Sequence, residues 1–406
     1  MEKTTTALRQ SIVKKFLINS LTGTAPQTHI QRSTMRLAVS AFYFCMGFSF
    51  MSWSSRIPDI KLKLQLSEGE LGSVLLALPI GQLLMMPVSG RLVAKYGSRN
   101  ILSFSILLYA VELTNIGWAT HGWQLALALF IFGLVGNLSN IAVNTQGILA
   151  EKIYGRPIMT TFHGIWSIAG FSGALTGLLM MNLQLTPRQH FFIVAALVII
   201  VAFIARRYLI AGTSGPAEKK KFFSKPEGVL VKLGIIAFCC MAAEGTMFDW
   251  SGVYFREIVK APESLVIMGL VTFMVMMATG RFAGDRIIAR IGRKKTLQVS
   301  GLFILTGLLI SVLLPYLVTA TIGFFIVGLG VSSVIPTVYS TAARSAKTSP
   351  SMALAGVSSI SFLGFLIGPP LIGYIAQISS LQYSFGVVAL FGLCVTIMVS
   401  KLKVMD

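Results

Sequence analysis

The pentapeptide "YGSRN" at residues 96–100 recurs as "IGRKK" at residues 291–295, which is 195 residues later. Three further matches keep nearly the same spacing: "MSWSS" (51–55) with "FDWSG" (248–252), "GLVGNLS" (133–139) with "GLGVSSV" (328–334), and Gly173 with Gly368. One match could arise by chance. Four matches in register indicate that the chain consists of two related halves.

The composition predicts a membrane protein. Of the 406 residues, 54% are hydrophobic and 12% are charged, whereas a soluble domain has about 25% charged residues. A helix needs about 20 apolar residues to cross a bilayer. Twelve such runs occur, at 34–54, 70–90, 100–118, 124–149, 160–181, 190–205, 229–252, 265–280, 296–315, 318–342, 352–377 and 382–400. We predict an all-α membrane protein with twelve transmembrane helices in two six-helix repeats.

The boundary between the halves is predicted in "RRYLIAGTSGPAEKKKFFSKPE" (206–227), which is charged and contains Gly, Ser and Pro, as linkers do. This division gives an N-terminal bundle at 34–205 and a C-terminal bundle at 228–400, flanked by tails at 1–33 and 401–406. Duplicated six-helix halves are typical of transporters, whose substrate site lies near the membrane midplane.

The net charge of +20 follows the predicted topology. If both termini are cytoplasmic, all but six of the 34 Lys and Arg residues fall on the cytoplasmic side, as the positive-inside rule requires. The charge therefore predicts orientation in the membrane and contact with membrane lipids, and it does not indicate nucleic-acid binding.

The sequence contains no nucleotide-binding P-loop, no HExxH motif and no GxSxG motif. The four cysteines lie within predicted helices, where we interpret them as small apolar residues, and the four histidines do not cluster. We therefore predict no enzymatic activity, no metal and no cofactor. Energy for transport would come from an ion gradient or from the solute itself.

The loops "GRLVAKYGSR" (90–99) and "GDRIIARIGRKK" (284–295) resemble the paired loop motif of the major facilitator superfamily. Three other stretches are similar to the branch that includes fucose permease and YbjJ-like inner-membrane transporters: "SWSSRIPDIK" (52–61), "NTQGILAEKIYGRPIMTTFHGIWSIAG" (144–170) and "EGTMFDWSGVYFRE" (244–257). The resemblance implies a monomeric transporter of a bacterial inner (plasma) membrane that works by alternating access. Its cavity would be lined by spans 1, 4, 5, 7, 10 and 11.

The resemblance also implies that the loop motif closes the cytoplasmic side, so we predict gating roles for Arg91, Arg99, Asp285 and Arg293. The first copy has Ala94 where the family has Asp, and in the second copy the acid is displaced by four residues to Asp285. Asp285 follows Arg281 by four residues, a spacing that suits a local ion pair. The alternative is that both loops act only as topology anchors.

Three acidic residues fall inside predicted spans: Glu112, Glu244 and Asp249. An ionisable group costs roughly 2.5–3.5 kcal/mol at the bilayer centre, so each is a functional candidate. At about 1.5 Å per residue from Lys232, Glu244 lies ~18 Å and Asp249 ~25 Å along span 7. We predict that Glu244 binds substrate and couples protons; the alternative is a permanent hydrogen bond to a neighbouring helix. Glu112, in a peripheral span, is a second candidate for proton coupling.

Asp249 points about 140° away from Glu244 around the helix. We predict that Asp249 gates or packs at the outer end, paired with Arg256 or Arg56. Trp53 and Trp250 occupy matching positions in the two halves near this end. They are predicted as parts of an outer gate or as anchors at the membrane interface.

Three amides, Asn137, Asn140 and Asn144, share one face of span 4 because their spacing is i, i+3, i+7. They either bond to neighbouring helices or bind substrate hydroxyl groups, since an amide both donates and accepts.

Span 10 contains Ser333 and Thr337 beside Pro336, which predicts a bent, polar-lined helix. Phe48 in span 1 and Trp166 in span 5 provide rings that could stack on a solute.

Together these features predict a secondary transporter for a small polar, sugar-like solute, with protons as the second partner. Span 1 has no acidic residue and span 4 has only Glu151 at its inner end, so proton coupling rests on Glu244. The first alternative is a proton-driven exporter of amphipathic drugs, which would have a large apolar cavity. The second is a membrane receptor that transports nothing.

Overall fold

The computed structural model describes residues 29–155, 158–211, 228–345 and 350–402, and all regular secondary structure in these residues is helical. Twelve helical segments within the described residues are long and apolar enough to cross a membrane, which confirms the all-α class and the predicted number of spans. The helices are α2 (His29–Ser54), α3 (Ile57–Leu64), α4 (Glu68–Leu75), α5 (Ala77–Tyr96), α6 (Ser98–Trp118), α7 (Gly122–Tyr154), α8 (Met159–Asn182), α9 (Pro187–Ala205), η1 (Arg206–Tyr208), α10 (Gly228–Glu257), η2 (Glu263–Leu265), α11 (Met268–Ile291), α12 (Arg293–Leu313), α13 (Leu317–Ser332), α14 (Val334–Ser345), α15 (Pro350–Ile378) and α16 (Leu381–Ser400).

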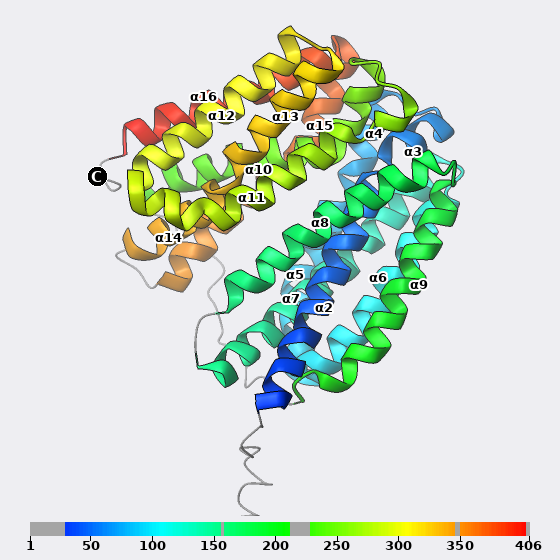
Figure 1. Cartoon of the computed structure of the whole chain (residues 1–406), viewed down its shortest axis with the longest axis vertical. Coiled ribbons are helices and arrows are strands. Elements are labelled where there is room, and N and C mark those ends of the chain that lie inside the picture. The colour runs from blue at the N-terminus through cyan, green and yellow to red at the C-terminus, as the bar shows by residue number, and fades with distance from the viewer. Residues whose placement is uncertain (1–28, 156–157, 212–227, 346–349, 403–406) are drawn as a thin grey trace, which may run out of the picture.

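The helices form two groups, α2–α9 and α10–α16, that meet at one end and diverge toward the other (Figure 1). Within the first group α2 packs on α8 and α5 on α7, and within the second α10 packs on α15 and α12 on α16. Contacts between the groups run through α4 with α15, α8 with α11, and α3 with α10. We call the end where α3 lies the α3 end, and the opposite end, where α2 begins and α16 ends, the tail end.

The two halves repeat the same backbone features. Gly97 and Gly292, 195 residues apart, follow α5 and α11 with φ of 81° and 80°, a left-handed region that glycine enters without a Cβ clash. A Cβ built on Gly133 would lie 2.1 Å from the Leu78 carbonyl oxygen, and one on Gly328 would lie 2.4 Å from that of Phe273. Both of these contacts are also related by 195 residues, so the sequence repeat corresponds to a repeat in helix packing.

Span 10 is interrupted, as the proline predicted. α13 ends at Ser332 and α14 begins at Val334. Pro336 has no N–H to bond the Ser332 carbonyl, which removes one bond of the helix ladder.

The predicted linker and tails fall largely on residues 212–227, 1–28 and 403–406, which lie outside the described residues. The domain boundaries therefore stay predictions.

Candidate functional site

A buried ion pair joins the middle of α10 to the middle of α11. Arg281 Nη2 lies 3.2 Å from Glu244 Oε1, and Arg281 Nη1 donates to Ser167 Oγ on α8 over 2.8 Å. The Glu244 side chain is 7% exposed and that of Arg281 is 27% exposed. Arg281 thus holds one group from each half of the molecule while part of its guanidinium stays accessible.

Arg281 was missed as a site residue because the apolar run of span 8 ends at residue 280. The helix continues to Ile291, so Arg281 lies inside α11 and not in the following loop. The expected partner of Arg281 was Asp285, whose side chain lies outside the described part of the structure. The described partners of Arg281 are Glu244 and Ser167 instead.

The amides of span 4 separate into two environments. Tyr43 Oη on α2 donates to Asn144 Oδ1, and Asn144 Nδ2 donates to Asn140 Oδ1, each over 2.8 Å. Asn140 is exposed and Asn144 is half-buried. Asn137 instead accepts a 2.8 Å hydrogen bond from Ser89 Oγ on α5. Asn137 therefore bonds a neighbouring helix of its own half. Asn140 and Asn144 keep part of their side chains accessible.

The Tyr43 ring connects this amide pair to the ion pair. It lies edge-on to His163, with ring centroids 5.6 Å apart. His163 is one turn before Ser167, whose hydroxyl donates to the His163 carbonyl over 3.2 Å. The Tyr43 ring thus contacts the helix turn that also contains Ser167, between the amide pair and the ion pair.

Aromatic rings from both halves gather on the other side of Glu244, toward the α3 end. Phe248 on α10 meets Phe50 on α2 with centroids 5.8 Å apart, and Phe365 on α15 at 6.3 Å. Phe50 also lies 6.5 Å from Trp166 on α8. The predicted Phe48 is not in this cluster: it is buried and stacks on Phe44 of its own helix at 5.6 Å. Phe50, and not Phe48, contacts Trp166 and Phe248. Stacking of a solute on either ring stays a prediction.

Among the described residues, the other predicted substrate and proton residues make no hydrogen bond to the ion pair. Thr337 donates to the Ser333 carbonyl of its own helix over 2.6 Å, and both side chains are buried. Glu112 is half-buried on α6, which packs on α7 and α9 within the first half.

The two halves are tied at the α3 end by shared carboxylates. Asp59 accepts from Arg56 at 2.6 Å and from Arg256 at 2.7 Å, and Lys61 binds Glu257 at 2.5 Å. Arg256 also binds the exposed Glu263 at 2.7 Å. Burial lowers the pKa of the Arg56 guanidinium, while the hydrogen bond and the charge of Asp59 raise it. Arginine remains charged in proteins, so Asp59 places one negative charge between two cations, one from each half.

This arrangement corrects the pairing predicted for Asp249. Arg56 and Arg256 both bind Asp59, and Arg56 also donates to His190 Nδ1 and to the Leu185 carbonyl. Asp59 belongs to the short helix α3, which lies between the first two apolar runs of the sequence.

The indoles of Trp53 and Trp250 are 1% and 0% exposed. Interface anchors sit at the lipid headgroups, so burial excludes that alternative for both residues. They lie in the packed region below the Asp59 ion pairs, where Ser54 Oγ donates to the Phe248 carbonyl across the halves.

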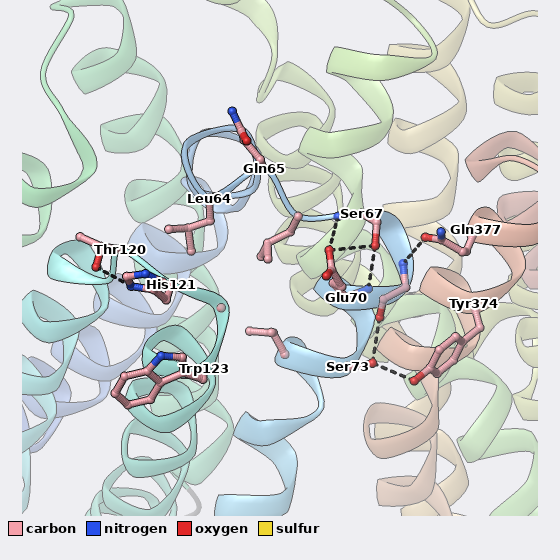
Figure 2. Close-up of a pocket in the computed structure, with 14 residues that line it drawn as sticks. Leu64, Gln65, Ser67, Glu70, Ser73, Thr120, His121, Trp123, Tyr374 and Gln377 are labelled. Atoms are coloured by element: carbon pink, nitrogen blue, oxygen red, sulfur yellow. Dashed lines mark hydrogen bonds between the residues drawn. The ribbon is translucent and has the colours of Figure 1, made fainter.

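Two more contacts across the halves border an open hollow of about 760 Å³ at the α3 end (Figure 2). The Gly69 N–H donates to Gln377 Oε1 over 3.1 Å, and the hydroxyls of Ser73 and Tyr374 lie 2.8 Å apart. The hollow is lined by residues of α3, α4, α7 and α15 and by none of the predicted site residues. The hollow is at the α3 end, and none of its lining residues is Glu244 or Arg281.

The tail end lacks such ties in the described residues. Arg91 is exposed, Arg99 and Arg293 are half-buried, and no ion pair of these three is found in the described ranges. Their gating role, like that of Asp285, stays a prediction.

The sequence signature of the Major Facilitator Superfamily matches residues 39–352. The chain belongs to this superfamily. A relative of the superfamily, an uncharacterized MFS-type transporter of Yersinia pestis, is 33% identical over 365 residues, which are 90% of this chain and 94% of the relative. The protein is therefore a secondary transporter and not an enzyme.

Solved structures with the same fold include two members at low sequence identity. The nucleoside transporter NupG matches with a TM-score of 0.71 at 14% identity, over 91% of this chain and 100% of NupG. A bacterial homologue of the human lysosomal transporter Spinster, in an inward-facing and occupied conformation, matches with a TM-score of 0.74 at 16% identity, over 92% and 97% of the two chains. These similarities establish the fold.

For a superfamily transporter, the distribution of contacts identifies the state. The hydrogen bonds that join the halves lie at the α3 end or at Arg281, and none lies at the tail end in the described residues. The structure is closed at the α3 end, and the halves diverge at the tail end (Figure 1).

Proposed function

We propose that this transporter moves a small polar, sugar-like solute across the bacterial inner membrane by alternating access, coupled to protons at Glu244. Both termini would lie in the cytoplasm, and the resemblance to the fucose permease and YbjJ-like branch belongs to this proposal. The observation that carries it is the bridge from Glu244 through Arg281 to Ser167, which links the two halves. The exposed amide of Asn140 adds a group that can bind hydroxyls. NupG, a nucleoside transporter of the same fold, handles a solute that is also polar and ring-bearing.

The proposed coupling follows from the charges of the bridge. Ionised Glu244 holds Arg281 by charge and hydrogen bond. Protonation removes the negative charge, so Arg281 is released to rearrange with the solute. Since a buried charge without a partner is costly, proton and solute occupancy become linked.

The variant Glu244→Gln is expected to lose proton-driven accumulation by about 10-fold or more, because the amide cannot carry the proton. Exchange of labelled for unlabelled solute should persist, since exchange needs no net proton movement. A thermal-shift screen of sugars, nucleosides and cationic dyes would first supply the solute, and flux would then be measured in proteoliposomes under a pH gradient. Glu263→Gln is the control, because the Glu263 side chain is 69% exposed, and it should accumulate like the wild type. Glu112→Gln tests the second candidate for proton coupling. Wild-type accumulation by Glu244→Gln would refute the proton role.

The cluster of Phe50, Trp166, Phe248 and Phe365 favours a second candidate, a proton-driven exporter of amphipathic compounds. Asn140→Ala discriminates the two functions. It should weaken binding of a polar solute by roughly 5- to 10-fold, since a neutral hydrogen bond contributes about 1 kcal/mol, and leave dye efflux unchanged. Phe365→Ala should do the reverse if the protein is an exporter. Binding measured by thermal shift and dye efflux from the same proteoliposomes provide the comparison.

A further inference from the structure

We propose that the solute is a hydroxylated monoanion, such as a sugar acid, whose carboxylate binds Arg281 while Glu244 carries one proton. Proton and anion would then cross together without net charge movement. This inference rests on the proposed function and adds the charge of the solute and the stoichiometry.

The first support is the accessibility of Arg281. Its two described hydrogen bonds use two of the five N–H groups of a guanidinium, and 27% of the side chain is exposed. A guanidinium binds a carboxylate through two parallel hydrogen bonds, a geometry that a neutral hydroxyl cannot reproduce. The pair with Glu244, at 3.2 Å through one nitrogen, is not of this two-bond kind.

The second support is the charge balance of the site. With Glu244 ionised, the pair is neutral and an added anion would have no counter-charge. With Glu244 protonated, Arg281 is left positive and one carboxylate restores neutrality. Because net charge in a low-dielectric site is costly, the proton and the anion favour each other's binding.

The elements packed around the pair contribute few other titratable groups. The described ones at this level of the helices are Tyr43 on α2, His163 on α8, Cys240 on α10 and Tyr339 on α14. α15 has no charged residue in its sequence. Two further acids lie on these helices: Asp249, five residues beyond Glu244 toward the α3 end, and Asp285, one turn beyond Arg281 toward the tail end, whose side chain is outside the described part. The variant Glu244→Gln distinguishes Glu244 from His163 and Asp249 as the group that binds the proton.

The third support is the set of polar groups on the helices around Arg281. Ser167 on α8 accepts a hydrogen bond from the guanidinium, and the Tyr43 hydroxyl on α2 bonds the amide pair of Asn144 and Asn140 on α7. Such groups hydrogen-bond hydroxyls. A solute with a carboxylate at one end and hydroxyls along its body has the chemistry that these groups would bind.

In the transport step, a proton binds a carboxylate oxygen of Glu244 and the Arg281–Glu244 ion pair is broken. The solute carboxylate then takes the N–H groups that Glu244 released. On the other side of the membrane the solute leaves, Glu244 loses its proton to water, and the original pair forms again. One negative and one positive charge move in the same direction.

The test uses matched acids and neutral sugars on the full-length protein in detergent. Probes are D-galacturonate, D-glucuronate and D-gluconate, each paired with its neutral counterpart D-galactose, D-glucose or D-glucitol. We expect a thermal shift with at least one acid at pH 5.5 that is lost at pH 8, and none with the neutral partner. Glu244→Gln should bind the same acid equally at both pH values. Equal binding of a neutral partner, or no shift with any acid, would overturn the inference.

Arg281→Gln should weaken acid binding at least 10-fold, because hydrogen bonds to charged groups are the strong ones. Arg290→Gln, exposed on the same helix, is the control and should bind normally. Arg281→Gln could fail to fold because Glu244 would lose its partner. In that case the double variant Arg281→Gln/Glu244→Gln removes both charges, and it should show the same weakening of acid binding. Retained acid binding in either variant contradicts the assignment.

Flux in proteoliposomes separates this inference from the proposed function. Uptake of the acid under a pH gradient should not change when a membrane potential is set with potassium and valinomycin, because a proton and a monoanion together carry no net charge. Proton-coupled uptake of a neutral sugar that responds to the potential would refute the anion while leaving the proposed function intact. Absence of any proton-coupled flux would refute both.

Discussion

The variant Asp59→Asn is expected to shift the transporter toward the state that is open at the α3 end. Asp59 is the carboxylate shared by Arg56 of the first half and Arg256 of the second, at 2.6 and 2.7 Å. Without its charge two guanidinium groups face each other with no anion between them. Hydrogen bonds between charged groups contribute about 1.5–3 kcal/mol, so the population ratio should change by roughly 10- to 100-fold.

Spin labels at Leu62 on α3 and Lys260 after α10, both exposed, would report this change as a longer distance in a background without the native cysteines. Glu263→Gln is the matched control, because Glu263 binds the same Arg256 but is 69% exposed. Exposed pairs contribute about 1 kcal/mol or less, so this variant should keep the wild-type distance. An unchanged distance in Asp59→Asn would show that the Asp59 ion pairs do not hold the α3 end closed.

The variant Gly81→Ala is expected to abolish most of the folded protein. A Cβ at this position of α5 would lie 2.1 Å from the Phe130 carbonyl oxygen of α7, and a backbone atom in a packed helix cannot move aside. Overpacking of a core typically costs 1–3 kcal/mol or more. Here the added Cβ would push α5 away from α7 along the whole length over which the two helices pack. Yield of monodisperse protein after detergent extraction, together with its Tm, provides the measurement.

Gly90→Ala, on the same helix, is the control because a Cβ there meets nothing within 4 Å. It should fold as well as the wild type. Equal yield and Tm for the two variants would mean that the close approach of α5 to α7 is not required for folding.

The fold was predictable because each helix that crosses a membrane must be apolar over its length. The number of apolar runs therefore gives the number of spans. The related stretches "YGSRN" and "IGRKK" indicate the duplicated halves. The middle position of Glu244 also followed from counting residues along one helix, and the structure buries it there.

The partners of these residues were not predictable, because residue spacing describes only one helix at a time. Arg281 directly follows an apolar run, although its helix continues to Ile291. Asp59 lay in a segment without an apolar run, so helix α3 was missed. Phe48 and Phe50 are both aromatic, and only the packing of α2 against α8 and α10 decides which of them meets Trp166 and Phe248.

The contact between α8 and α11 restricts how the halves can move. It extends from Gly177 beside Ile267, past Gly170 beside Met274, to Gly164 beside the Phe282 ring. Small residues along this contact let the two helices approach closely. Alternating access requires the contacts at the α3 end to separate, whereas the contact between α8 and α11 extends from that end past the middle of the helices. Arg281 and Ser167, which lie in its middle part, should therefore change their separation less between states than the residues that surround Asp59.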